Sequence, residues 1–370
     1  MSAPVDWERA ERIAIRIASR QPLPANGSLT SSDFTDIAAI AEDRVAATTG
    51  LRSLLGPATV QVIDRADWIR ANVASFRGLI DPVLDRWSAQ AGRDGRMGGA
   101  LVAASRQVAA AEVGAMLGWM SGRVLGQYDL LFGKAVAEPV TDPESAGRPR
   151  GDGAVYLVGP NVVLLENRFG FAPDEFRLWV TLHELTHRAQ FTGVPWMHQH
   201  FLGLVQRTLD LADPDPGRML AAVRDALRDR DAAKQRLRDG GIVAMVATPE
   251  QQQLFHQIGG LMSLLEGHGD VVMDRAGADV IPSAERFARV LRERRQRANP
   301  LARIIQRLTG LEGKLNQYIA GERFIAAIEA VGGERAIDRC WEHPDNLPSL
   351  DEIRSPELWL DRVGAGQPVA

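Results

Sequence analysis

The residues with the clearest capacity for chemistry lie in the stretch Thr181–Phe191, which reads TLHELTHRAQF. Two histidines, His183 and His187, are four residues apart, and Glu184 directly follows the first of them. On an α-helix, positions four apart lie one above the other on the same face, so both imidazoles can reach one ion. Glu184 is rotated enough to lie beside that ion. The spacing therefore predicts a metal centre on a helix.

The chemistry that this pattern predicts is that of a catalytic zinc ion. Zinc takes neutral imidazoles or carboxylates in a near-tetrahedral set, and in catalytic sites it leaves one position for water. The ion lowers the pKa of that water, and a neighbouring glutamate can then accept its proton near neutral pH. We therefore expect His183 and His187 to be metal ligands and Glu184 to be the general base.

The competing interpretation is a chance match on an exposed helix. The flanking residues argue against it, because they are apolar and predict a largely buried helix. They are Leu178, Trp179, Val180, Leu182 and Leu185. Two histidines and a glutamate that are buried away from water need partners, and a metal ion satisfies all three. We favour the metal centre.

A third protein ligand must come from elsewhere in the chain. One common zinc pattern has glycine three and histidine six residues after the second histidine, but Gln190 and Gly193 occupy those positions. The other common arrangement uses a glutamate on a later helix, and the sequence LLEGHGD at 264–270 supplies Glu266 and Asp270. We expect Glu266 to bind the metal and Asp270 to accept a hydrogen bond from a ligand histidine. Four other histidines stay open as alternatives for the third ligand: His198, His200, His256 and His268.

Composition limits the partners. The chain has 370 residues, of which 45% are hydrophobic and 24% charged, and its net charge is -4. This balance is typical of a globular protein and argues against binding to nucleic acid or to anionic membranes. Cys340 is the single cysteine, so a metal must be held by histidine or carboxylate.

The N-terminus and the best candidate for a membrane segment bear on location. Asp6, Glu8 and Glu11 lie where a secretory signal would be basic and then apolar. The candidate, the glycine-rich run 113–125, is too short to span a membrane. We expect a cytoplasmic protein that does not contact membranes.

The elements expected before the metal motif are mostly helical. Apolar spacings of three and four run through the first 135 residues, where four glycines are expected to form one stripe for close helix packing. These are Gly114, Gly118, Gly122 and Gly126. A loop is expected over 137–153. Two aliphatic runs, Val155–Val158 and Val162–Leu165, flank Gly159-Pro160-Asn161 and predict a hairpin, which would either pair with an extended substrate or cap the helices.

The elements expected after the motif are also helices. Charged residues predict one helix to about residue 238. Thr248, Pro249 and Gln251 form the pattern of a capped helix start, with Thr248 and Gln251 as a capping box, for a helix running to about residue 274. Three more helices are expected at 283–297, 300–309 and 312–330, followed by turns and short helices.

The expected class is mainly α with a small β-hairpin or sheet. Residues 1–136 form an N-terminal helical region and 150–365 a catalytic region, packed together as one unit.

Four blocks of sequence together resemble the zincin-like metallopeptidase type 2 family. They read HELTHRAQFTGVPW, LMSLLEGHGDVVMD, LEGKLNQYIAGERFI and WEHPDNLPSLDEI. The resemblance implies a largely helical zincin fold and a zinc hydrolase. Members of that family are often labelled as associated with biosynthesis of the deazaflavin coenzyme. The sequence itself has no glycine-rich phosphate loop of the kind that binds nucleotides.

The catalytic residues are completed by a donor for the charge that develops on the attacked carbonyl oxygen. Tyr318 is the candidate for this role, and Arg323 is the alternative. The resulting expectation is a Zn²⁺-dependent hydrolase of peptide or small amide bonds. The alternative is a zincin-shaped scaffold or binding protein without turnover. Glu184 favours the enzyme, because a scaffold needs the ligands but not the base.

Overall fold

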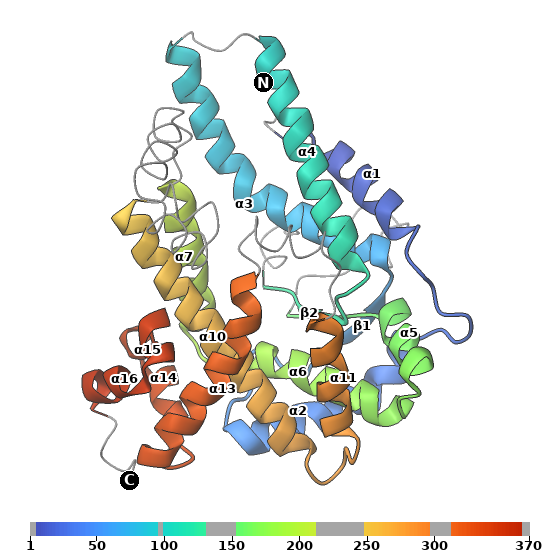
Figure 1. Cartoon of the computed structure of the whole chain (residues 1–370), viewed down its shortest axis with the longest axis vertical. Coiled ribbons are helices and arrows are strands. Elements are labelled where there is room, and N and C mark those ends of the chain that lie inside the picture. The colour runs from blue at the N-terminus through green and yellow to red at the C-terminus, as the bar shows by residue number, and fades with distance from the viewer. Residues whose placement is uncertain (1–4, 95–98, 131–152, 212–247, 297–311, 365–370) are drawn as a thin grey trace. The chain divides into compact units, whose positions relative to one another are not determined.

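The computed structural model describes residues 5–94, 99–130, 153–211, 248–296 and 312–364 (Figure 1). The fold is mainly α-helical with one small sheet, as the sequence predicted. The chain divides into two compact units. The first comprises Met1–Gly193 with Ala276–Ala284, and the second comprises Val194–Arg275 with Glu285–Ala370. The division expected from sequence, 1–136 and 150–365, follows different boundaries and stays a prediction.

The first unit contains a three-stranded sheet with the order β1-β3-β2. The central strand β3 (Val155–Val158) pairs in parallel with β1 (Val60–Ile63) and antiparallel with β2 (Gly126–Tyr128). All four residues of β3 are buried, as expected for a strand paired on both edges. Because β3 is the central strand, β1 and β2 are both edge strands.

The predicted hairpin is wrong in its second half. Val155–Val158 is a strand, but Val162–Leu165 lies in helix α5 (Gly159–Phe169). Pro160 occupies the first turn of that helix, where its fixed φ suits a helix start as well as it suits a turn. The helix ends at Gly170, which adopts the left-handed conformation. Because the second run is helical, β3 takes its partners from distant parts of the chain.

Helices α1 (Trp7–Ala18) and α4 (Gly99–Ser121) lie side by side in the first unit, close to α3 (Arg65–Asp94) (Figure 1). A Cβ atom on Gly114 would lie 2.6 Å from the Ala10 carbonyl oxygen, and one on Gly118 would lie 2.8 Å from that of Ala14. Gly114 and Gly118 confirm the prediction of close helix packing. The other two glycines of the predicted stripe do not belong to it, because Gly122 follows the end of α4 and Gly126 is part of β2.

The remaining helices of the first unit include α2 (Thr35–Thr49) and α6 (Pro173–Gly193), which pack against each other. A short 3-10 turn, η1 (Ser31–Phe34), precedes α2. Helix α6 carries the HELTH motif, as predicted. Its first turn contains Asp174 and Glu175, and negative charges at that end interact favourably with the helix dipole.

The second unit contains α7 (Met197–Asp210), most of α10 (Pro249–Gly277) and α11 (Ala284–Gln296), and α13 (Glu312–Gly332). The predicted capping box at the start of α10 is confirmed. The Thr248 amide donates to Gln251 Oε1 at 2.7 Å, and the Gln251 amide donates to Thr248 Oγ1 at 3.1 Å. The helices expected up to residue 238 and at 300–309 lie outside the described residues.

The C-terminal part of the second unit alternates turns with short helices, as predicted. These are η4 (Ala336–Asp338), α14 (Arg339–Glu342), η5 (Pro344–Asn346), α15 (Leu350–Arg354) and α16 (Pro356–Val363). Trp359 is fully buried, with its ring edge-on to Phe324 at 5.4 Å between centroids. Cys340 is also fully buried. In the described part of the chain, no helix has the length and apolar character needed to cross a membrane.

Candidate metal centre

Helix α6 brings the two motif histidines face to face. The Nε2 atoms of His183 and His187 are 3.1 Å apart, and the ring planes are at 82° to each other. Two imidazole lone pairs at this distance repel each other unless a proton or a cation lies between them. The geometry therefore suits a shared cation, which is what the i, i+4 spacing predicted.

Gln190 orients one of these rings. Its Oε1 atom lies 2.9 Å from Nδ1 of His187, and its side chain is fully buried. Because a carbonyl oxygen only accepts, this contact places the proton of a neutral His187 on Nδ1 and leaves the Nε2 lone pair for an ion. From the sequence alone, Gln190 indicated only that one zinc pattern is absent. Its position three residues after a ligand histidine was the signal for this role.

The helix is buried around the motif, as its apolar flanks predicted. Glu184 is 7% exposed, and Thr181, Thr186 and Arg188 are also buried. Thr186 donates to the Leu182 carbonyl at 2.7 Å, which satisfies its hydroxyl within the helix. A glutamate so nearly shielded from water has an environment unlike that of a surface carboxylate, which favours a chemical role.

Arg188 fixes α6 to the rest of the first unit. Its guanidinium donates to Glu42 Oε1 at 2.7 Å, to the Gly56 carbonyl at 2.8 Å and to the Gly153 carbonyl at 3.0 Å. Glu42 in turn accepts from the Ala58 amide at 2.9 Å. One side chain thus ties the motif helix to α2, to the loop before β1 and to the start of β3. The role of Arg188 was not predictable from the sequence, because its partners are distant in the chain.

Strand β2 lies against the same helix. Tyr128 stacks on Phe191 of α6 with ring centroids 6.0 Å apart, and Gly126 lies against the side chain of Glu184. Burial raises the pKa of Tyr128 to about 12, so its phenol stays neutral.

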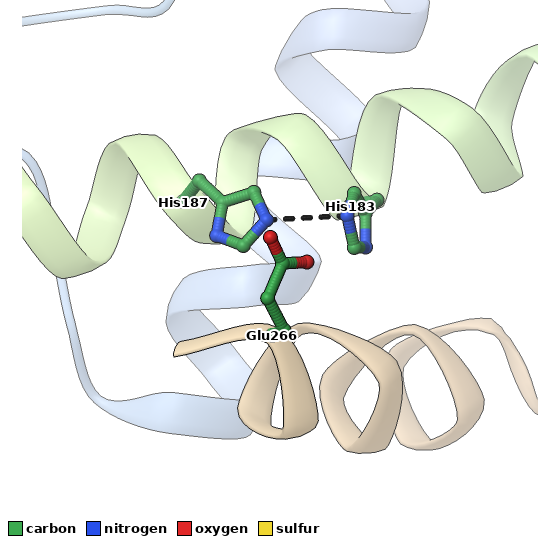
Figure 2. Close-up of side chains that lie close together, drawn as sticks. All are labelled: His183, His187 and Glu266. Atoms are coloured by element: carbon green, nitrogen blue, oxygen red, sulfur yellow. Dashed lines mark hydrogen bonds between the residues drawn. The ribbon is translucent and has the colours of Figure 1, made fainter. Parts of the chain in front are cut away.

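Glu266 of α10 has its carboxylate close to the two imidazoles (Figure 2). One ligand atom from each of His183, His187 and Glu266 lies within 4.8 Å of the other two. Among the described residues, no other set of three histidine, cysteine or acidic side chains meets in this way. Two imidazoles and one carboxylate form a known ligand set of catalytic zinc, so the chemistry of these donors fits that ion.

The other two predicted site residues lie on α10 and α13. Asp270 is half-buried one turn after Glu266 on α10. Tyr318 falls on α13, and its side chain lies outside the described part of the structure. Of the alternative ligands, His268 is buried with its ring 5.2 Å from that of Trp341.

The remaining alternative histidines lie on two helices. His200 of α7 is half-buried with its ring 5.7 Å from Trp196, and His198 of the same helix is also half-buried. His256 of α10 has a side chain 48% exposed, 3.5 Å from Asp351.

Two comparisons with known proteins found similar proteins. The chain is similar to a protein from Chloroflexus aurantiacus, whose crystal structure is described as that of a candidate hydrolase with a novel fold. The two are 30% identical, with a TM-score of 0.68 over 97% of this chain and 99% of the other. No curated protein matches the chain. The sequence profile of the zincin-like metallopeptidases matches residues 5–360. The chain therefore belongs to the zincin-like metallopeptidase family.

Proposed function

We propose that this protein is a zinc-dependent hydrolase of peptide or small amide bonds. The observation that carries the proposal is the pair of Nε2 atoms 3.1 Å apart on α6, beside a glutamate that is only 7% exposed. Membership of the zincin-like metallopeptidase family and the similarity to a candidate hydrolase support the same class of reaction.

His183, His187 and Glu266 would hold the ion. A zinc ion held there supplies Lewis acidity, which lowers the pKa of a water molecule and polarises the carbonyl group under attack. Glu184 accepts the proton of the attacking water and later delivers it to the leaving nitrogen. Asp270 is proposed to accept a hydrogen bond from a ligand imidazole, and Tyr318 to donate one to the developing oxyanion.

One finer feature of the proposal comes from the family resemblance. The link with deazaflavin coenzyme biosynthesis comes from labels on similar proteins, so a deazaflavin precursor that contains an amide bond belongs among the substrates to be screened.

The first test concerns the metal. His183→Ala and His187→Ala should each lose the bound zinc of the purified protein, measured by elemental analysis, because each removes one of three protein ligands. Glu266→Ala should also lose it. His256→Ala is the matched control, since this histidine lies on the same helix as Glu266, and it should keep the zinc. Full retention of zinc in both histidine variants would refute the site.

The second test concerns turnover. A peptide and amide library screened with and without chelator should reveal chelator-sensitive cleavage. Glu184→Gln keeps the shape of the side chain but removes its basicity, so zinc should stay bound while kcat falls by a factor on the order of 10²–10⁴. Unchanged turnover in this variant contradicts the mechanism. Bound zinc with no cleavage of any substrate would instead favour a metal-stabilised scaffold.

A further inference from the structure

Gly126, the first residue of β2, lies against the side chain of Glu184. A Cβ atom built on Gly126 would be 2.6 Å from Cγ of Glu184, 2.7 Å from Cδ and 2.7 Å from Oε1. Carbon atoms in van der Waals contact are about 3.5–4.0 Å apart, so these distances describe a clash. The space that any other side chain would need at this position is occupied by the carboxyl group of Glu184.

The backbone before Gly126 is held in place, so β2 cannot easily move away. The Val158 amide donates to the Leu125 carbonyl at 2.8 Å, which joins the residue before Gly126 to the central strand. The buried side chain of Asn161 donates to the Val124 carbonyl at 2.7 Å. Moving the strand would break these bonds and leave buried polar groups without partners, which is costly.

The two residues after Gly126 hold the strand from both faces. Gln127 accepts a hydrogen bond from the Asn72 side-chain amide at 3.2 Å, on the face turned away from α6. Tyr128, on the same face as Gly126, stacks on Phe191. A larger residue at position 126 would therefore displace the glutamate in preference to the strand.

Glu184 can respond only by changing its first side-chain torsion. Rotation near the end of the side chain would move Cδ and Oε1 but would leave Cγ in the clash at 2.6 Å. On a helix few χ1 rotamers are allowed, and each alternative points the side chain in another direction. The carboxylate would then no longer point in its present direction.

We propose that Gly126 is a positioning residue, whose missing side chain keeps the Glu184 carboxylate directed at the reacting water. The contact between Gly126 and Glu184 follows from the geometry. Its effect on catalysis rests on the proposed function, in which Glu184 is the general base. Gly126 does not touch the substrate or the ion in this role. It sets the rotamer of the residue that does the proton transfer.

A double-mutant cycle measured by urea unfolding tests the contact without zinc or substrate. Gly126→Ala should lower the urea midpoint in the parent protein, and this loss should disappear in a Glu184→Ala background, where the space is free. Gln127→Ala, on the opposite face of the strand, is the control and should have the same effect in both backgrounds. If Gly126→Ala does not fold alone but folds together with Glu184→Ala, the proposal stands. An equal loss in both backgrounds, or none in either, overturns it.

Measurement of kcat tests whether Gly126 affects catalysis through Glu184. Gly126→Ala should lower kcat on the order of 10²-fold, the cost of a misplacement of about 1 Å, while KM and zinc content stay close to those of the parent protein. Gly78→Ala, at a position on α3 with open space for a side chain, should leave kcat unchanged. Full kcat in Gly126→Ala overturns the positioning role, as does a loss of zinc that accounts for the loss of kcat. If the parent protein cleaves no amide, the proposed function fails, and the unfolding cycle still decides whether Gly126 sets the position of Glu184.

Discussion

The two helices that carry the proposed ligands are held in their own units by opposite means. Helix α6 is fixed by the forked hydrogen bonds of Arg188, which reach Glu42 and three backbone carbonyls. Helix α10 is fixed by close approach of backbones. A Cβ atom on Gly267 would lie 2.4 Å from the carbonyl carbon of Gly321, and one on Gly260 would lie 2.2 Å from the Pro348 oxygen.

The difference predicts how each region fails. The contacts of α6 depend on atoms that are present, so removal of Arg188 leaves the buried Gly153 carbonyl and the half-buried Glu42 carboxylate without this donor. The contacts of α10 depend on glycines that have no side chain. Addition of a single methyl group at Gly267 would therefore force α10 and α13 apart. Two regions of similar burial should therefore respond to opposite kinds of substitution.

Arg188→Ala should produce the largest effect. Its removal leaves the half-buried Glu42 carboxylate and the buried Gly153 carbonyl without this donor, and we expect a loss of about 3 kcal/mol in the free energy of unfolding. Arg188 is 2% exposed, which places its guanidinium in a setting where water cannot replace it. Urea unfolding measures the loss. The control is Arg335→Ala, whose side chain is 78% exposed beside Asp338 and should cost less than about 1 kcal/mol. Equal losses of stability in the two variants would show that the hydrogen bonds of Arg188 do not hold α6 in place.

Gly267→Ala should produce the next largest effect, about 1–3 kcal/mol in the free energy of unfolding, because the new methyl group meets backbone that cannot rotate away. Gly203→Ala is the matched control, since Gly203 also lies within a helix of the second unit but has open space around it. Alanine there should stabilise by about 0.4–1 kcal/mol through its lower entropy in the unfolded chain. A neutral Gly267→Ala would show that α10 and α13 do not depend on their close approach.

The smallest effect concerns pH and sharpens the description of the second unit. Burial, aided by Arg207, lowers the pKa of His200 below its usual 6.5. The unfolded chain then binds a proton below pH 6.5 that the folded chain does not, so this contribution to stability is present above pH 6.5 and is lost as the pH falls. His200→Gln should reduce the dependence of the urea midpoint on pH in this range. An unchanged slope in His200→Gln would contradict the assignment.

Features that depend on neighbouring residues were predictable from the sequence. The capping box of Thr248 and Gln251 and the pairing of His183 with His187 both follow from positions within two helical turns. The third proposed ligand, Glu266, was reached only through knowledge of common zinc ligand sets, with four histidines as alternatives. Helix geometry alone could not select it, because it belongs to another helix.

Features that depend on distant pairing were not predictable. Strands β1 and β2 have four and three residues, and such short runs carry too little pattern to be identified. The second half of the predicted hairpin was wrong because proline suits both a turn and a helix start. The contact between Gly126 and Glu184 joins residues far apart in the chain, and glycine spacing suggested a helix stripe instead.

The buried Cys340 has a practical consequence for labelling the molecule. Burial raises the pKa of its thiol, and a buried, protonated thiol reacts slowly with maleimides. In the native protein Cys340 should therefore contribute little labelling when thiol-reactive spectroscopic tags are attached elsewhere. Cysteines introduced at the exposed positions Leu54 and Val331, one in each unit, would accept a pair of spin labels whose separation in solution could be followed as substrates or chelators are added. Delayed labelling of Cys340 itself would report each transient opening of the second unit.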